Sequence, residues 1–162
     1  MPRYVKQRDK YSCGPVAILN ALRWAGVNAD YGQSVKRFTA TCKCAPPEGT
    51  AHREFDSALR KAGKRIFQVR RVHRPLLPQI EAHLQEGGVI VFNYYWRKKD
   101  EEHRHFILLA GISGSGRTFY TVNDFRKGRA LRKYQRRYFK KWHLRFQSTD
   151  PHYKAWFVSR RD

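Results

Sequence analysis

The 162-residue sequence has only three cysteines, few acidic residues and no long apolar run. Three is an odd number, so the cysteines cannot all pair within the chain, and the N-terminal sequence MPRYVK lacks the apolar core of a signal peptide. No segment approaches the roughly 20 apolar residues that a membrane-spanning helix needs. We therefore predict a chain without a transmembrane segment, in the reducing environment of the cytoplasm.

Acidic residues are scarce: 13 Asp and Glu stand against 34 Lys and Arg, which gives a formal net charge of +21. Two explanations stay open. The charge can serve contact with a polyanion such as nucleic acid, an acidic protein or an anionic membrane, or it can be a cationic surface suited to a salty milieu. An apolar content of 41% argues against disorder as the dominant state. Residues 1–162 are predicted to form one domain.

Four helices are expected from apolar spacing and from glycines that stop them. The first is the most apolar: it opens at Cys13-Gly14-Pro15 and ends at Gly26, which predicts a largely buried helix with Cys13 at its N-terminal end. Thr50 is the expected N-cap of the third helix. The expected ranges of the other three are 33–40, 51–62 and 76–86.

Strands are expected mainly in the second half of the chain, at 66–72, 89–96, 105–111 and 118–123. Short turns join the last three strands, which predicts an antiparallel meander. Helices followed by strands indicate an α+β fold.

Cys13 is the candidate nucleophile. A thiol attacks a carbonyl well only as the thiolate, and the unpaired N–H groups at a helix N-terminus favour that anion. Gln7 lies six residues earlier, so a short loop can return its amide to the thiol as a donor to an oxyanion. The backbone N–H of Cys13 is the expected second donor.

A histidine from elsewhere in the fold is expected as the general base. His105 begins an apolar strand and is preferred over His103, two residues earlier. Asp124 ends the next strand, where it can orient the imidazole, and Asn123 competes with it because only one of the two can face the histidine.

These segments resemble the papain-like cysteine peptidases, and most closely the double-glycine (bacteriocin leader) peptidases and their stand-alone relatives. The resemblance spans roughly residues 5–126. It rests on four motifs in this order along the chain. The first two are Gln7 six residues before Cys13-Gly14-Pro15, and Gly49-Thr50 just before a predicted helix. The other two are a helix that ends in glycine and leads into a strand, over residues 80–92, and the apolar strand that begins at His105 and is followed by Val122-Asn123-Asp124.

The resemblance implies a papain-like fold and four catalytic residues: Cys13 as nucleophile, His105 as base, Asp124 as orienting acid and Gln7 in the oxyanion hole. It implies a protein or peptide substrate and no cofactor. Ser12 and Phe125 stand where the leader peptidases often have aspartate and proline, so double-glycine specificity carries over less well than the catalytic chemistry.

Two other clusters were considered. Cys42 and Cys44, with His52, lack a recognisable four-ligand set, so no metal is predicted. Residues 126–145 hold ten Lys or Arg and no acid, with Leu131, Tyr134, Tyr138 and Trp142 near one helical face. This pattern predicts an amphipathic helix. Its aromatic face is expected to cover the core, and its basic face is either solvated or binds a polyanion or nucleic acid, with the second favoured for the charges.

The sequence therefore predicts a cysteine peptidase that cleaves a peptide or isopeptide bond through an acyl-enzyme. Acyl transfer to another amine is a rival within the same fold. The alternative from another class is a basic nucleic-acid-binding protein that retains a peptidase-like fold with little activity.

Overall fold

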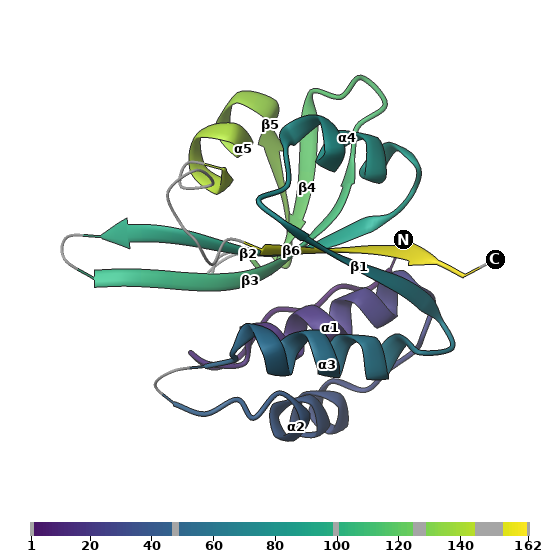
Figure 1. Cartoon of the computed structure of the whole chain (residues 1–162), viewed down its shortest axis with the longest axis vertical. Helices are drawn as coiled ribbons and strands as arrows, with labels where there is room; N and C mark the ends of the chain where they lie inside the picture. The colour runs from purple at the N-terminus through teal and green to yellow at the C-terminus, as the bar shows by residue number, and fades with distance from the viewer. Residues whose placement is uncertain (1, 47–48, 99–100, 125–128, 145–153, 162) are drawn as a thin grey trace.

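The computed structural model describes residues 2–46, 49–98, 101–124, 129–144 and 154–161. These residues form a central antiparallel sheet with helices on both faces (Figure 1). The helices α1, α2 and α3 lie on one face, and α4 and α5 lie on the other. This arrangement is the expected α+β architecture, with the nucleophile helix packed on an antiparallel sheet.

The boundaries of the elements follow the sequence pattern closely in the first half of the chain. The helices are α1 (Cys13–Trp24), α2 (Tyr31–Thr41), α3 (His52–Gly63), α4 (Leu77–Gln85) and α5 (Arg136–His143). The strands are β1 (Phe67–His73), β2 (Val89–Lys98), β3 (Glu101–Ile112), β4 (Thr118–Val122), β5 (Leu131–Gln135) and β6 (Lys154–Arg160).

The six strands are arranged in the order β1-β6-β2-β3-β4-β5, and each neighbouring pair is antiparallel. The predicted meander of β2, β3 and β4 is confirmed. The pairing of β3 with β4 ends at Leu108 and Val122, so β4 does not extend along β3 as far as His105 and Phe106. This short β4 leaves room beside the start of β3, where the candidate site lies.

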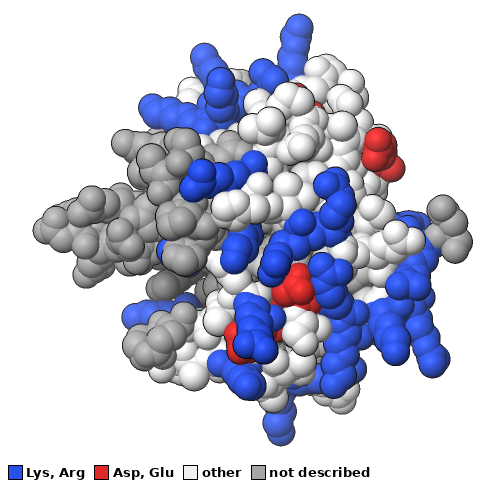
Figure 2. Space-filling view, viewed as in Figure 1, with Lys and Arg blue, Asp and Glu red and all other residues white. Residues whose placement is uncertain are grey.

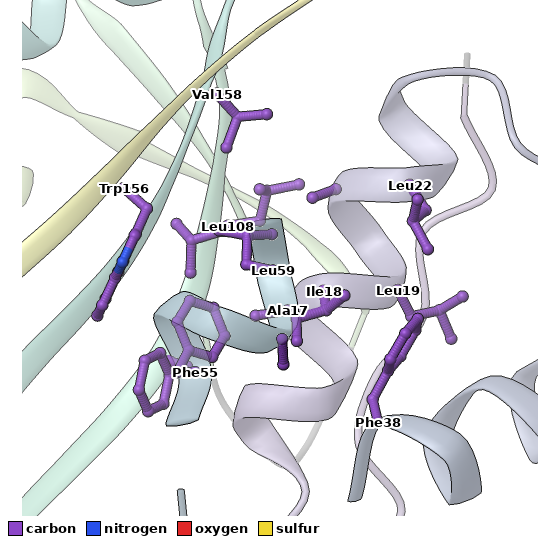
Figure 3. Packing of buried hydrophobic residues seen from close by; sticks show 14 of the residues in the cluster. Ala17, Ile18, Leu19, Leu22, Phe38, Phe55, Leu59, Leu108, Trp156 and Val158 are labelled. Carbon is purple, nitrogen blue, oxygen red and sulfur yellow. The ribbon is translucent and has the colours of Figure 1, made fainter. Parts of the chain in front are cut away.

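The larger apolar core lies between the sheet and the α1 side (Figure 3). Ile18 and Leu19 of α1 are fully buried, and Phe55 of α3 stacks on Phe106 with ring centroids 4.4 Å apart. Burial of such a side chain stabilises the fold by about 1.5–3 kcal/mol. This core fixes the start of α1 against β3 and so fixes the position of Cys13.

The opposite face of the sheet carries a second core. Phe139 of α5 is fully buried and stacks on Phe119 of β4 with centroids 4.2 Å apart. Strand alternation divides β3 between the two cores: Phe106 and Leu108 belong to the first, and Ile107 and Leu109 belong to the second. Both faces of β3 are therefore buried.

The prediction for the C-terminal part of the chain is wrong in one respect. A single helix was expected over 126–145, but the described part of this segment forms the edge strand β5 and then the shorter helix α5. Leu131 and Tyr134 consequently lie on β5 rather than on a helix face. Residues 125–128 and 145 lie outside the described residues. Strand β6, which the sequence analysis did not predict, lies between the edge strand β1 and β2.

Two further observations complete the fold. Thr50 is not the N-cap of α3: Ala51 occupies that position, without a side-chain cap. Among the described helices, none has both the length and the apolar character that crossing a bilayer requires.

Lys and Arg side chains are spread over much of the face seen in Figure 2, and Asp and Glu occupy only a few places on it. The positive charge of the sequence is thus visible on this face of the molecule.

Candidate active site

Cys13 is the first residue of α1, as predicted, and only 8% of its surface is exposed. The backbone N–H groups of Cys13 and Gly14, at the start of the helix, donate toward its sulfur, as does the N–H of Phe106 from β3. Gly14 lets the Thr50 loop approach the helix: a Cβ built on Gly14 would lie 2.7 Å from Thr50 Oγ1 and 2.9 Å from Thr50 Cβ. The thiol is therefore enclosed by α1, β3 and the Gly49-Thr50 loop.

Burial, rather than the helix start, dominates the electrostatics of the thiol. It raises the pKa of Cys13 to about 11, and the hydrogen bonds from the backbone N–H groups only partly oppose this rise. Burial thus opposes the expected preference of the helix start for an anionic sulfur. A raised pKa favours the protonated thiol, which needs a base to remove its proton when it reacts.

A pocket of about 410 Å³ opens beside Cys13. Its described lining comes from the segment before α1, from the loop before α3, and from β2 and β3. The lining residues are Lys10, Tyr11, Cys13, Gly49, Thr50, Ala51, His52, Asn93, Arg104 and Phe106. The pocket is large enough for part of a peptide, and it places Cys13 where an entering carbonyl group could reach it.

Gln7 is buried and tied to Asn123, which follows β4. Its backbone N–H donates to Asn123 Oδ1 at 2.9 Å, and its Oε1 accepts from Asn123 Nδ2 at 3.0 Å. Gln7 Nε2 donates one hydrogen to the carbonyl oxygen of Asp9 at 2.8 Å. Because a side-chain amide has two N–H hydrogens, one more remains for an oxyanion.

His105 lies one residue before Phe106, whose N–H approaches the Cys13 sulfur. Its Nε2 donates to the backbone carbonyl oxygen of Asn123 at 2.5 Å. Because a carbonyl oxygen only accepts hydrogen bonds, Nε2 carries the hydrogen and Nδ1 is the basic nitrogen of the neutral ring. The described partner of the imidazole is therefore the main chain of Asn123.

His105 alternates with Ile107 and Leu109, so its side chain leaves β3 on the face opposite to Phe106. The thiol and the imidazole can therefore meet only around the edge of β3, beyond the point where β4 ends at Val122.

Asp124 is buried within a polar network on the second face of the sheet. Its Oδ2 accepts from Thr121 Oγ1 at 3.0 Å and lies 2.9 Å from His143 Nε2 of α5. Tyr134 of β5 also hydrogen bonds to this carboxylate, and burial together with the nearby negative charge raises the tyrosine pKa. Asp124 is thus engaged by residues from β4, β5 and α5.

The structure brings together Gln7, Asn123 and His105, and it places the Cys13 sulfur at the backbone N–H of Phe106, the residue after His105. Sequence reasoning missed the pocket residues Lys10, His52 and Asn93. His52 was weighed only as a zinc ligand, but its ring lies edge-on to Phe106 and Trp156 in the pocket. Its position two residues after Thr50, in a segment of the resemblance, was the signal available.

The other cysteines do not form a described metal site. Cys42 is buried in the first core, and the Sγ of Cys44 donates to the carbonyl oxygen of Tyr11 at 3.1 Å. Within the described ranges, no group of three or more His, Cys, Asp or Glu side chains is arranged to hold a metal ion.

Among solved structures, the chain is similar to the crystal structure of a double glycine motif protease from an AMS/PCAT transporter, in complex with the leader peptide. The TM-score is 0.61 and the identity is 14%, with coverage of 98% of this chain and 91% of that one. No family model and no curated protein matches the sequence. The likeness confirms that this chain has the papain-like α+β fold of a cysteine peptidase.

Proposed function

We propose that this chain is a cysteine peptidase that hydrolyses a peptide or isopeptide bond through an acyl-enzyme on Cys13. The observation that carries the proposal is the position of Cys13: it starts a buried helix, borders a pocket, and meets β3 at the amide next to His105. The papain-like fold supports the same class of chemistry.

In this mechanism His105 Nδ1 removes the Cys13 proton as the sulfur attacks the substrate carbonyl. The Asn123 carbonyl holds the other ring nitrogen and fixes the orientation of the imidazole. The second N–H hydrogen of Gln7 and the Cys13 N–H stabilise the oxyanion. The imidazolium then protonates the leaving amine, and water activated by the same ring hydrolyses the thioester.

Asp124 takes a different part from the one the resemblance implies. In our proposal its carboxylate is a positioning group that anchors the segment after β4 through Thr121 and His143. It thereby holds the neighbouring Asn123 carbonyl against His105.

The test is labelling with an electrophilic peptide probe, such as a peptide chloromethyl ketone, at neutral pH, with the modified cysteine identified by mass spectrometry. We expect Cys13 to react faster than Cys42 and Cys44, and we expect this preference to fall in His105→Ala. His73→Ala, on the exposed strand β1, is the matched control.

Two results would contradict this assignment. Equal labelling of all three cysteines would remove Cys13 as an activated nucleophile. Loss of labelling in His52→Ala with full labelling in His105→Ala would identify the pocket histidine as the base.

The alternative of nucleic-acid binding is favoured by one observation: Lys133, Arg137 and Lys140 of the basic segment are exposed. In that case Cys13→Ala would leave binding of single-stranded nucleic acid intact, and the affinity would fall steeply with salt. Neutralising these three side chains together would weaken binding, and peptide labelling would be unaffected.

A further inference from the structure

The pocket beside Cys13 has a strong charge bias. Of its described lining residues, Lys10, His52 and Arg104 are basic and none is acidic. Lys10 and Arg104 are both exposed, and they come from different parts of the chain, one from the segment before α1 and the other from β3. A group that enters the pocket therefore meets a lining that carries two cationic side chains.

The rest of the lining suits a peptide backbone. The Asn93 side chain is buried on β2, next to Phe106 in the β2–β3 register, and its amide offers both a donor and an acceptor. The aromatic rings of Tyr11 and Phe106 supply apolar surface. A peptide with a carboxylate side chain matches this combination of polar, apolar and cationic groups.

We infer that the pocket selects peptide substrates that carry an acidic side chain close to the bond attacked by Cys13, with Lys10 and Arg104 as the groups that recognise the carboxylate. The inference rests on the proposed function for the location of the scissile bond. It extends that function by naming the substrate class.

Arg104 and Lys10 are expected to differ in how they bind a carboxylate. Arg104 lies two residues before Phe106 on the same face of β3, so its guanidinium belongs to the side of the pocket where Cys13 lies. A guanidinium binds a carboxylate through two parallel hydrogen bonds, whereas the ammonium of Lys10 acts as a point charge. Arg104 is therefore expected to contribute more to selectivity than Lys10.

The test measures binding alone, in full-length Cys13→Ala, so that turnover is not required. The probes are two fluorescein-labelled, C-terminally amidated octapeptides of glycine and alanine, one with two central aspartates and the other with asparagines instead. We expect the aspartate peptide to bind about tenfold more tightly at 0.15 M salt, since two rim cations each give up to about fivefold.

Substitutions then locate the effect. Arg104→Gln should weaken binding of the aspartate peptide by about fivefold and Lys10→Gln by about twofold, and together they should remove its advantage. The matched controls are Arg137→Gln and Lys140→Gln on α5, across the sheet, where screening over about 8 Å leaves little influence on the pocket. They should change the affinity by less than about 1.5-fold.

Several outcomes would overturn the inference. Equal affinity for the two peptides would do so, as would equal losses in the control variants, since net charge alone would then explain binding. A neutral peptide with a free C-terminal carboxylate that binds as tightly would reassign the site to chain ends. An oligothymidylate that displaces the peptide and needs Lys10 and Arg104 would reassign it to nucleic acid.

The two proposals fail separately. If Cys13→Ala prefers the aspartate peptide but the wild-type protein is never labelled at Cys13, the recognition stands without the peptidase. If the wild-type protein labels and cleaves without regard to charge, the peptidase stands without the recognition.

Discussion

The buried thiol of Cys13 makes protein stability depend on pH in a way that tests the site directly. Burial raises its pKa from 9.0 to about 11. Between these values the native state retains a proton that the unfolded chain has released. The stabilisation from the neutral thiol is therefore complete below pH 9 and is lost as the pH rises through 11. A shift of two pKa units corresponds to about 2–3 kcal/mol.

The assay compares urea unfolding of the wild-type protein and Cys13→Ala at pH 8 and at pH 11. Other buried groups also titrate here: burial raises the pKa of Cys42 to about 12 and that of Tyr4 to about 12. Both proteins contain these groups, so the difference between the two unfolding free energies isolates Cys13. We expect the wild-type advantage over Cys13→Ala to fall by about 2–3 kcal/mol between the two pH values.

The opposite pH dependence of the wild-type advantage would refute the proposal that Cys13 is protonated in the free protein. If the helix start and His105 held Cys13 as a thiolate in the free protein, its native pKa would lie below the unfolded value. The wild-type advantage would then grow as the pH rose from 6 to 9, and it would stay constant above that range. A difference that does not change with pH would show that the environment leaves the thiol unperturbed. Either result would replace the neutral-thiol mechanism proposed above.

Three further predictions test the packing around the site. Gly14→Ala should destabilise the protein by about 1–3 kcal/mol in urea unfolding, because its Cβ meets Thr50, and Thr50→Gly in the same chain should recover most of the loss. Asn123→Gly should lower the free energy of unfolding by about 1–3 kcal/mol, because the hydrogen bonds to Gln7 are lost. Asn123→Ala should lower it further in the same assay, because alanine adopts the φ of 63° at this position less readily than glycine. Trp156→Phe should lose about 1–2 kcal/mol by thermal unfolding, since the indole N–H donates to a carboxylate at 2.8 Å.

The elements that sequence predicted well are those whose signals are local. The first helix follows from its dense apolar run and from Gly26, and the meander follows from apolar strands joined by short turns. Strand β5 was missed because its five residues include Arg132 and Lys133, which suit an edge strand facing water as well as a helix. Strand β6 carries a local signal in the apolar run Ala155-Trp156-Phe157-Val158, which was overlooked, but its pairing with the sequence-distant β1 and β2 has none.

The candidate site likewise contains some features that have a local sequence signal and others that have none. The positions of Cys13 and Gly14 follow from helix-start chemistry and could be predicted. The partner of His105 could not, because it is a backbone carbonyl whose direction is set by the left-handed conformation of Asn123. The burial that opposes the expected thiolate could not be predicted, because the sequence does not show how completely the first core encloses the sulfur.

Asn123 joins two roles that the sequence assigned to separate residues. Asparagine is one of the few residues that adopt a positive φ readily, and here this conformation turns the side chain to Gln7 and the carbonyl to His105. The oxyanion donor and the general base of the proposed mechanism are thereby held by one residue. The next residue, Asp124, accepts a hydrogen bond from His143 of α5, which lies beyond the sequence motifs of residues 5–126. The C-terminal part of the chain therefore supports the active-site geometry as well as the sheet, and a version truncated after the resemblance would lose both.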